Sequence, residues 1–273
     1  MTRSSERLLT YAVLVVFSLG AVLPILGVIG LAMHEPGSLV SGFGLPDGLH
    51  LGTFSYAWER ANFSTYVQSS VIVSLAVVAA STFISILAGY AFGTMRFKGD
   101  TALFYTLLLG MIIPFEAVVI PLYYDMREFG LTDSYWALIL PQVGLNVSFG
   151  TFWMRAYFRS VPRTMVDAAH IDGASQWRIL WRVLLPPGRP AVVTLMLLLF
   201  MWSWNEFLLA LVMIQSDELR TAPLGLAFFV GNRSTDYVGL AAASLIVALP
   251  VVVVYLILQR DFIRGMFTGA LRG

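Results

Sequence analysis

Long apolar stretches alternate with short polar segments along the chain of 273 residues. A helix needs roughly 20 mainly apolar residues to cross the hydrocarbon core of a bilayer. Six stretches meet this requirement, so the pattern predicts an all-α membrane protein with six transmembrane helices. These spans cover, to within a few residues, 8–33, 67–92, 103–124, 136–157, 191–213 and 239–258.

The connections between the spans are too short to hold a separate soluble domain. The longest are 34–66, 158–190 and 214–238. The first span could be confused with a secretory signal, but it is long for such a segment and has no clear cleavage site before His34. We therefore predict that this span is retained and that residues 1–273 form one transmembrane domain.

The basic residues are distributed unevenly among these connections. Lys and Arg are enriched in the cytoplasmic loops of membrane proteins, which sets their orientation. If the N-terminus is cytoplasmic, 13 of the 17 basic residues are cytoplasmic, and only Arg60, Arg127, Arg220 and Arg233 lie outside. The distribution therefore predicts that both termini face the cytoplasm and supports the count of six spans.

The composition agrees with a membrane protein and excludes several kinds of chemistry. Only 12% of the residues are charged and the mean hydropathy is +0.78, whereas globular domains carry roughly 25% charged residues. There is no cysteine, and the three histidines are far apart in the sequence, so we predict neither a disulfide nor a metal site. The sequence also lacks the phosphate-binding loop GxxxxGK[ST] and the HExxH, GxSxG and GxGxxG motifs. We therefore expect a chain that is not an enzyme and does not hydrolyse ATP by itself.

The connection 158–190 is unusually polar for a segment between two spans and predicts two joined helices. The first would begin near Ser160, with Pro162 in its first turn, and end at Asp172, because Gly173 suits the left-handed position after a helix. The second would begin at Ala174 and end before the fifth span. Its apolar side chains recur at helical spacing, on the face opposite Ser175, Arg178 and Arg182, until Pro186 and Pro187 end it; they are Trp177, Leu180, Trp181, Leu184 and Leu185.

Two interpretations of this connection are open from the residues alone. A basic amphipathic helix can simply anchor a loop on lipid headgroups. The tight turn at Asp172 and Gly173 instead favours a shaped docking element, in which the second helix packs on the membrane domain and the first projects outward.

At these residues the sequence resembles the EAA motif of importer-type ABC transporter permeases. The matching positions are Asp167-Ala168-Ala169, Asp172-Gly173-Ala174 and Leu184-Leu185-Pro186. The spacing of Ala169, Gly173 and Pro186 agrees with the motif. Asp167 replaces the usual Glu, which keeps the charge and shortens its reach, and Val183 replaces the usual Ile.

Further segments resemble the carbohydrate-uptake, MalG-like permeases. They are Phe97-Lys98-Gly99, Ile120-Pro-Leu-Tyr123, Trp202-Ser-Trp-Asn-Glu-Phe207 and the tail 262–273. The resemblance implies a type I importer permease in the cytoplasmic membrane of a bacterium or archaeon. Its expected partners are a second homologous permease, an ATPase dimer that binds ATP and Mg, an extracytoplasmic solute-binding protein and membrane lipid. No cofactor is expected in this chain, and no nucleic acid among its partners.

The resemblance also assigns a role to the first helix of the connection. It implies a coupling helix seated in a groove of the ATPase, made of Asp167, Ala168, Ala169, His170, Asp172, Gly173 and Ala174. This role is physically reasonable, because closure of a soluble ATPase moves membrane helices only through a rigid connecting element.

Polar side chains inside the predicted spans mark a candidate translocation path. Such groups are costly in lipid and are expected to face a bundle interior or a wet cavity. The candidates are Glu116, Gln142, Asn146, Trp204, Asn205 and Glu206. Sugars are bound by amide and carboxylate hydrogen bonds with aromatic stacking, although the same side chains can instead fix the packing of helices.

The sequence therefore predicts a permease subunit of an ATP-driven importer that moves a sugar or oligosaccharide by alternating access. Uptake of glycerol-phosphate, a polyol or an amino sugar is an alternative. A secondary transporter or channel would leave the docking segment unexplained, and a membrane-embedded enzyme lacks a nucleophile and base within its spans.

Overall fold

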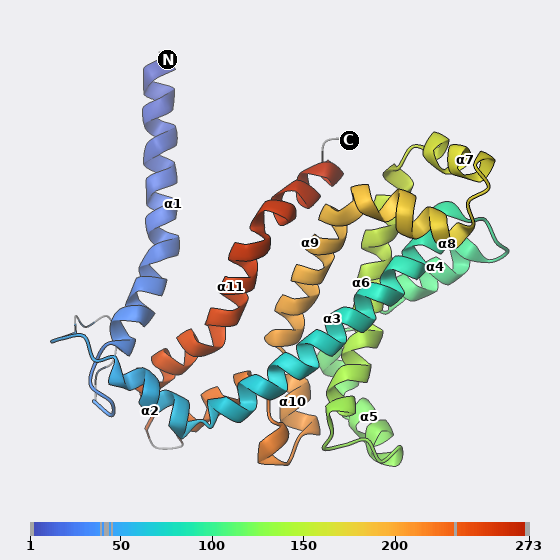
Figure 1. Cartoon of the computed structure of the whole chain (residues 1–273). Coiled ribbons are helices and arrows are strands. Elements are labelled where there is room, and N and C mark those ends of the chain that lie inside the picture. Colours follow the sequence, from blue (N-terminus) through green and yellow to red (C-terminus); the bar gives the residue numbers. More distant parts are fainter. Residues whose placement is uncertain (1–2, 39, 41–43, 45, 232–233, 271–273) are drawn as a thin grey trace. The chain divides into compact units, whose positions relative to one another are not determined.

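A computed structural model describes residues 3–38, 40, 44, 46–231 and 234–270 of the chain. Arg233 and Arg272, which enter the charge argument, and residues 271–273 of the tail lie outside this part. The described residues are predominantly helical and contain no β-strand, only an isolated bridge between Val230 and Thr235 (Figure 1). The all-α fold predicted from the sequence is confirmed.

The helices follow one another with short connections. Those before the polar connection are α1 (Arg3–Ala32), α2 (Gly52–Arg60), α3 (Phe63–Thr94), α4 (Asp100–Leu109), α5 (Phe115–Glu128) and α6 (Tyr135–Ser160). Those from the connection onward are α7 (Arg163–Ile171), α8 (Gln176–Arg178), the π-helix η1 (Ile179–Leu184), α9 (Leu185–Trp204), α10 (Leu208–Met213), the 3₁₀ helices η2 (Asp217–Leu219) and η3 (Ala222–Phe229), and α11 (Tyr237–Ala270).

Five helical segments of the described chain are long and apolar enough to cross a membrane. They are Glu6–Ala32, Phe63–Thr94, Tyr135–Ser160, Gln176–Trp204 and Tyr237–Gly265. Each contains most of one predicted span.

The remaining predicted span, 103–124, differs from the prediction because it is divided into α4 and α5. Residues 110–113 form turns between the two helices. Pro114 is extended, with φ −64° and ψ 126°, and precedes the first residue of α5. A proline disfavours helical backbone at the residue before it, so Ile113 cannot readily continue α4. Two short helices replace one long one, and the count of six membrane crossings stays a prediction.

The chain forms two compact units. The first combines residues 1–64 with 224–249, and the second combines 65–223 with 250–273. The units share the helices α3 and α11, whose residues are divided between them. The single transmembrane domain expected from the sequence stays a prediction.

In the first unit, a charged and aromatic cluster joins α2 to the segment before α11. The Tyr56 hydroxyl donates to Asp236 Oδ2 at 3.0 Å and accepts from Arg60 Nη1 at 2.8 Å. The Arg60 guanidinium lies 5.8 Å from the centre of the Phe229 ring, and this ring meets Tyr56 edge-on. Asp236 also accepts the Gly239 N–H at the start of α11. This cluster ties Phe229 at the end of η3 and Asp236 before α11 to α2.

Helix α1, also in the first unit, is exposed along most of its length. Every residue from Glu6 to Leu26 is exposed, and the apolar window of this segment has no buried residue. Its surface is apolar on all sides, which is typical of a helix surrounded by lipid or by another membrane chain.

The second unit is built on close contacts of α3 and α9 with α6. Gly89 of α3 lies so near α6 that an added Cβ would be 2.5 Å from Met154 Cβ and 2.9 Å from the Arg155 nitrogen. Gly150 of α6 lies equally near Ser85, whose Oγ would be 2.1 Å from an added Cβ. Small residues allow such approach in membrane helices. The GxxxG spacing of Gly89 and Gly93 therefore serves packing within this chain.

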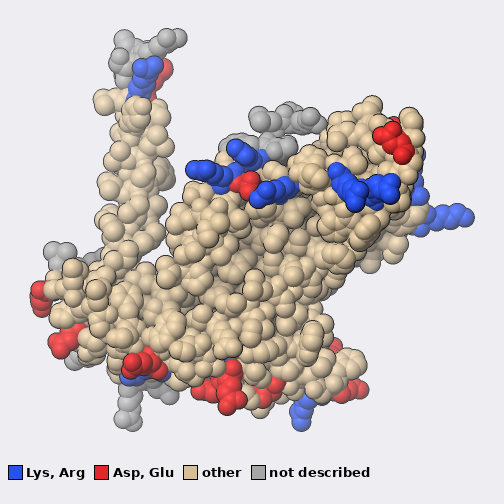
Figure 2. All heavy atoms as spheres, viewed as in Figure 1, with Lys and Arg blue, Asp and Glu red and all other residues tan. Residues whose placement is uncertain are grey.

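Charged residues gather at opposite ends of the second unit. In this unit, Lys and Arg gather at the end that carries α7 and α8, and Asp and Glu side chains gather at the end that carries α5 and α10 (Figures 1 and 2). The basic loops and the acidic loops, which the charge bias assigns to opposite sides of the membrane, thus lie at opposite ends of this unit. That the α7 end faces the cytoplasm stays a prediction.

At the acidic end, Asp133 ties the loop before α6 to the loop after α10. Its carboxylate accepts the N–H groups of Gln215 and Ser216 at 3.0 and 2.8 Å and the Ser216 hydroxyl. Its own N–H donates to the Met213 carbonyl, and its φ is +55°. The Ser216 hydroxyl and the backbone N–H groups lower the pKa of Asp133, which outweighs the opposing effect of burial.

We expect Asp133→Asn to lower the melting temperature at neutral pH and to have less effect in acid. Because the folded-state pKa is lowered, the ionised carboxylate stabilises the folded state above its ordinary pKa, and this contribution is lost as pH falls through the lowered value. Thermal unfolding of both proteins from about pH 6 down to about pH 3 should show the difference in melting temperature shrinking. Asp125→Asn, at an exposed acid of the same end, should change little. A difference that is constant across this range would contradict the expectation.

Candidate coupling and translocation sites

Helix α7 ends in a tight, hydrogen-bonded turn. Gly173 has φ +72°, its N–H donates to the His170 carbonyl at 3.0 Å, and the Ala174 N–H donates to the Ala169 carbonyl at 2.9 Å. This pair of bonds is the Schellman arrangement, which requires a left-handed residue after the helix. The predicted glycine turn is confirmed. The start of α7 differs from the prediction, because Ser160 is the last residue of α6 and Pro162 precedes the first helical residue, Arg163.

The second helix of the connection begins one residue after Ser175 and does not end at the prolines. Ser175 Oγ accepts the Arg178 N–H at 3.4 Å. The helix then passes through η1 into α9, with Pro186 and Pro187 in the first turn of α9. The predicted stop at Pro186 is therefore wrong.

Helix α6 holds this junction in place. The Tyr157 hydroxyl donates to the Leu184 carbonyl at 2.6 Å, and the Trp153 indole N–H donates to the Ala191 carbonyl at 2.9 Å. Gly188 lies against the Tyr157 ring, where an added Cβ would be 2.5 Å away. These contacts pack the continuous helical segment Gln176–Trp204, formed by α8, η1 and α9, on α6. We call this segment the lever.

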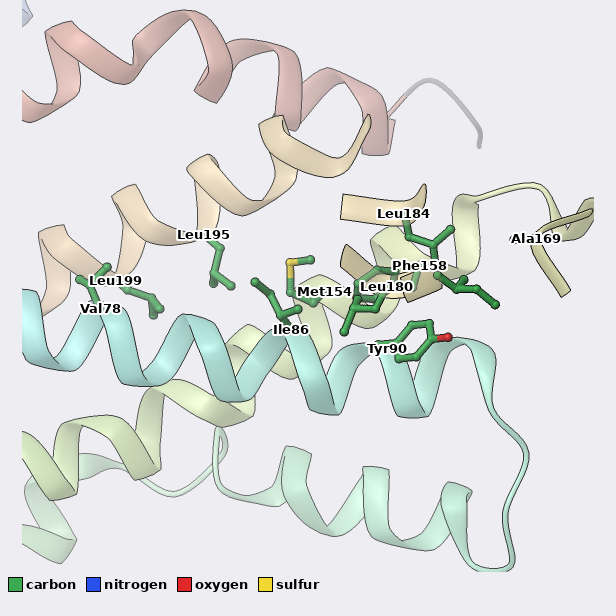
Figure 3. Packing of buried hydrophobic residues seen from close by; sticks show 11 residues of the cluster. Val78, Ile86, Tyr90, Met154, Phe158, Ala169, Leu180, Leu184, Leu195 and Leu199 are labelled. Atoms are coloured by element: carbon green, nitrogen blue, oxygen red, sulfur yellow. The ribbon is translucent and has the colours of Figure 1, made fainter. Parts of the chain in front are cut away.

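The predicted apolar stripe anchors this lever, with one change in its membership. Side chains of α3, α6, η1 and α9 meet in one buried cluster (Figure 3). Leu180 and Leu184 are fully buried, but Trp177 is 59% exposed and Ile179 takes the buried place. The wider turn of a π-helix changes which residues share a face, and no pattern of apolar residues in the sequence indicates it.

Helix α7 presents most of the motif residues to solvent. Asp167, Ala168, His170, Asp172 and Gly173 are exposed. Ala169 is 8% exposed and belongs to the buried cluster, so only Ala168 of the predicted alanine pair faces outward. Next to it, Ile171 is 87% exposed. A surface of small and polar residues with one exposed apolar side chain is suited to contact with another protein.

A chain of hydrogen bonds connects α7 to the end of α3. The Tyr90 hydroxyl donates to Gln176 Oε1, and Gln176 Nε2 lies 2.9 Å from His170 Nε2. With the amide nitrogen as donor, the His170 ring accepts at Nε2. No sequence pattern indicates Gln176 or Tyr90, since neither belongs to the EAA motif.

We expect Gln176→Leu to loosen α7 without unfolding the chain. It removes the only side chain that links Tyr90 to His170 in the described residues, and a lost hydrogen bond of this kind costs about 1 kcal/mol. Hydrogen exchange of residues 163–171 should accelerate about fivefold, while exchange in α6 stays unchanged. Gln259→Leu, which removes an exposed amide of α11, is the matched control. Equal exchange of α7 in wild type and variant would show that the chain of hydrogen bonds does not hold this helix.

The polar residues of the fifth predicted span lie at a break in the helix. Helix α9 ends at Trp204 and α10 begins at Leu208. Glu206 caps the start of α10, because its two carboxylate oxygens accept the N–H groups of Leu209 and Ala210 at 2.7 and 3.1 Å. Trp204 is 1% exposed, whereas Asn205 is exposed and donates to the Met201 carbonyl.

The other path candidates are distributed over two helices. Gln142 is 7% exposed and Asn146 half-buried, both on α6, and Glu116 is exposed in the first turn of α5. Helix α10 packs against both α5 and α6. The structure thus gathers the helices that carry these residues, while the closest polar contacts of Asn205 and Glu206 are to the backbone of their own segment.

These features define a polytopic α-helical membrane protein with a helical connection between two of its long apolar helices. A family model described as "Binding-protein-dependent transport system inner membrane component" matches residues 81–268. The chain belongs to this family of membrane permeases.

Individual relatives agree with this assignment. The chain is 34% identical over 229 residues to the probable ABC transporter permease protein YurM of Bacillus subtilis (strain 168), covering 84% of this chain and 76% of that protein. It is 31% identical to the arabinooligosaccharides transport system permease protein AraQ of Halalkalibacterium halodurans, covering all of both chains. A solved structure of a bacterial ABC transporter involved in import of the acidic polysaccharide alginate has the same fold, with a TM-score of 0.80 at 23% identity over 96% of this chain and 99% of that one. The type I importer architecture expected from the sequence is thereby confirmed.

Proposed function

We infer that this chain moves a sugar or oligosaccharide across the cytoplasmic membrane as one permease half of an ATP-driven importer. Coupling to an ATPase is supported by the hydrogen-bonded turn at Gly173. This turn connects the exposed helix α7 to the lever, whose apolar side chains are buried in the second unit. The sugar class is supported by relatives such as AraQ, whose name assigns it to arabinooligosaccharide transport.

The proposed coupling uses α7 as the contact with the ATPase. Asp167, Ala168, His170, Asp172 and Gly173 offer an exposed surface, and Ala169 with Ala174 joins this surface to the packed part of the chain. When the ATPase dimer closes, a helix held at both ends transmits the displacement as a rigid body. The continuous helix from Gln176 to Trp204 would carry the motion to the break at Asn205.

The chain needs partners for this work. Its sequence has no ATPase motif, so ATP and Mg would be bound by a separate ATPase dimer, and the chain itself would be a transport subunit without enzymatic activity. A second homologous permease would supply the other half of the path. A solute-binding protein would deliver the solute on the extracytoplasmic side, as the family description implies.

The break between α9 and α10 is the proposed centre of the translocation path. Irregular backbone at membrane depth is tolerated where it lines a cavity or packs on protein. Asn205 is exposed there and keeps its amide oxygen available, and Glu116 of α5 is exposed as well. Trp204 and Glu206 would act by holding the break open, Trp204 through burial and Glu206 through its bonds to α10.

The test is uptake by proteoliposomes that contain this chain with its partner permease, ATPase and binding protein. A panel of labelled oligosaccharides, glycerol 3-phosphate, a polyol and an amino sugar is offered with and without ATP. We expect uptake of an oligosaccharide that requires both ATP and the binding protein. Uptake without ATP would instead establish a secondary transporter or channel, and uptake of glycerol 3-phosphate or a polyol alone would replace the sugar assignment.

A further inference from the structure

A pocket of about 580 Å³ lies in the second unit, between α7 and the ends of α3 and α6. Six of the residues that line it are charged or titratable, and they come from the loop after α3, the start of α4, the end of α6 and α7. They are Arg96, Asp100, Arg159, Arg163, Asp167 and His170.

The three arginines of this pocket have no counter-ion. Among the described residues, none of Arg96, Arg159 and Arg163 forms an ion pair, and the one ion pair in that part of the chain joins Arg220 to Asp217 elsewhere. Of the two carboxylates, Asp100 already accepts the N–H and the hydroxyl of Thr101. The guanidinium groups outnumber the carboxylates, so the pocket attracts an anion.

The chemistry of the lining favours phosphate among possible anions. A guanidinium presents a planar fork of N–H donors that matches two phosphate oxygens, and several arginines around one cavity can hold the same group. The wall toward the membrane is apolar, since Phe92 and Phe158 also line the pocket. An occupant with a charged head and an apolar neighbour fits both walls.

The depth of the pocket points to the headgroup region of the bilayer. Phe92 and Phe158 lie in the last turns of α3 and α6, two of the helices long and apolar enough to span a membrane. Their ends therefore mark the level at which lipid phosphates are found, and basic residues at this level attract anionic lipid. We propose that this pocket binds a phosphate group, supplied by the headgroup of an anionic phospholipid.

The position of the pocket gives the occupant a direct contact with α7. Asp167 and His170 belong to that helix, and His170 also meets Gln176. A bound headgroup would therefore stiffen α7, an effect on transport that rests on the proposed coupling role. Binding itself does not depend on that role, and the test below measures binding alone.

The test uses the full-length chain within its purified transporter, prepared with and without the ATPase, in a neutral maltoside detergent. Phosphatidylglycerol or phosphatidylcholine is added, and retained lipid is counted by native mass spectrometry alongside the melting temperature. We expect selective retention of phosphatidylglycerol. Changing Arg96, Arg159 and Arg163 together to Gln should weaken it by at least about fivefold. The matched control changes Arg178, Arg182 and Arg189, three exposed arginines outside the pocket, to Gln and should keep retention unchanged.

A second variant keeps the experiment informative if the triple Gln variant does not fold. Changing the same three arginines to Lys preserves the net charge but removes the planar fork, so binding should still weaken. Inorganic phosphate, added without lipid, separates the two sources of the group. If it alone raises the melting temperature of wild type and not of the pocket variants, the phosphate site is confirmed with a soluble ligand in place of lipid.

Three results would overturn the proposal. Equal loss of phosphatidylglycerol in the pocket and control variants would show a diffuse charge effect. No preference for phosphatidylglycerol, together with no effect of inorganic phosphate, would show that the pocket holds no phosphate. Retention by the permease alone that disappears when the ATPase is present would show that the ATPase occupies this surface.

Discussion

Gly173→Leu is expected to reduce solute-stimulated ATP hydrolysis and transport by about tenfold while the transporter still assembles. The backbone at Gly173 has φ +72°, a conformation that costs a residue with a Cβ about 1–2 kcal/mol. An added Cβ would meet no atom of this chain within 4 Å, so strain in the backbone is the effect that the substitution has within the chain. The relaxed chain would redirect α7 relative to the lever, and about 1.4 kcal/mol corresponds to a factor of ten.

Two controls separate the effect of backbone strain at Gly173 from the effect of replacing glycine there and from a general loss of stability. Asn tolerates the left-handed region, so Gly173→Asn should retain most of the activity. Gly130→Leu applies comparable strain, at φ +68° and with open space around the Cβ, but at the opposite end of the second unit. Full transport by Gly173→Leu would contradict a rigid joint at this position. Equal loss in Gly130→Leu would show that strain acts through stability and not through coupling.

Gly89→Leu is expected to lower the stability of the second unit by several kcal/mol, enough to prevent accumulation of the folded chain. The Cβ alone would lie 2.5 Å from Met154 Cβ and 2.9 Å from the backbone nitrogen of Arg155. Overpacking a core costs about 1–3 kcal/mol even when side chains can move, and backbone atoms of α6 cannot move without shifting the helix. Yield and melting temperature in detergent measure the effect.

The matched control for Gly89 is a glycine of α6, the helix that Gly89 contacts, with free space around its Cα. Gly144 of α6 has no atom within 4 Å of an added Cβ, so Gly144→Leu should be tolerated. Gly89→Ala should fall between the two, because the short side chain still meets the α6 backbone. If Gly89→Leu and Gly144→Leu accumulate equally well, α3 and α6 do not pack as closely as described.

The parts of the fold that the sequence predicted well rest on local physical rules. Apolar length predicts a membrane helix without knowledge of its neighbours, and five of the predicted spans have matching helices. The turn at Gly173 was predictable for the same reason, since only the local backbone decides where a helix ends in a left-handed residue.

The parts that differ depend on contacts that the sequence does not show. Pro186 and Pro187 would end an isolated helix, but Tyr157 and Trp153 of α6 hold the chain in helical geometry across them. Ile179 replaces Trp177 in the core because η1 is a π-helix. In the predicted path, Trp204 is buried by packing with neighbours such as Phe200, and no spacing rule distinguishes it from the exposed Asn205 beside it.

The exposure of α1 has a consequence for the order of events during synthesis. No residue in the apolar window of α1 is buried by the rest of the chain. Its backbone hydrogen bonds are internal and its side chains are stable in lipid, so its insertion does not require the other helices to be present. It can enter the bilayer as an independent segment and find its neighbours later by lateral diffusion. Insertion of α1 and assembly of the other helices are then separate steps, and a defect in packing such as that at Gly89 would leave α1 correctly inserted in an otherwise unassembled chain.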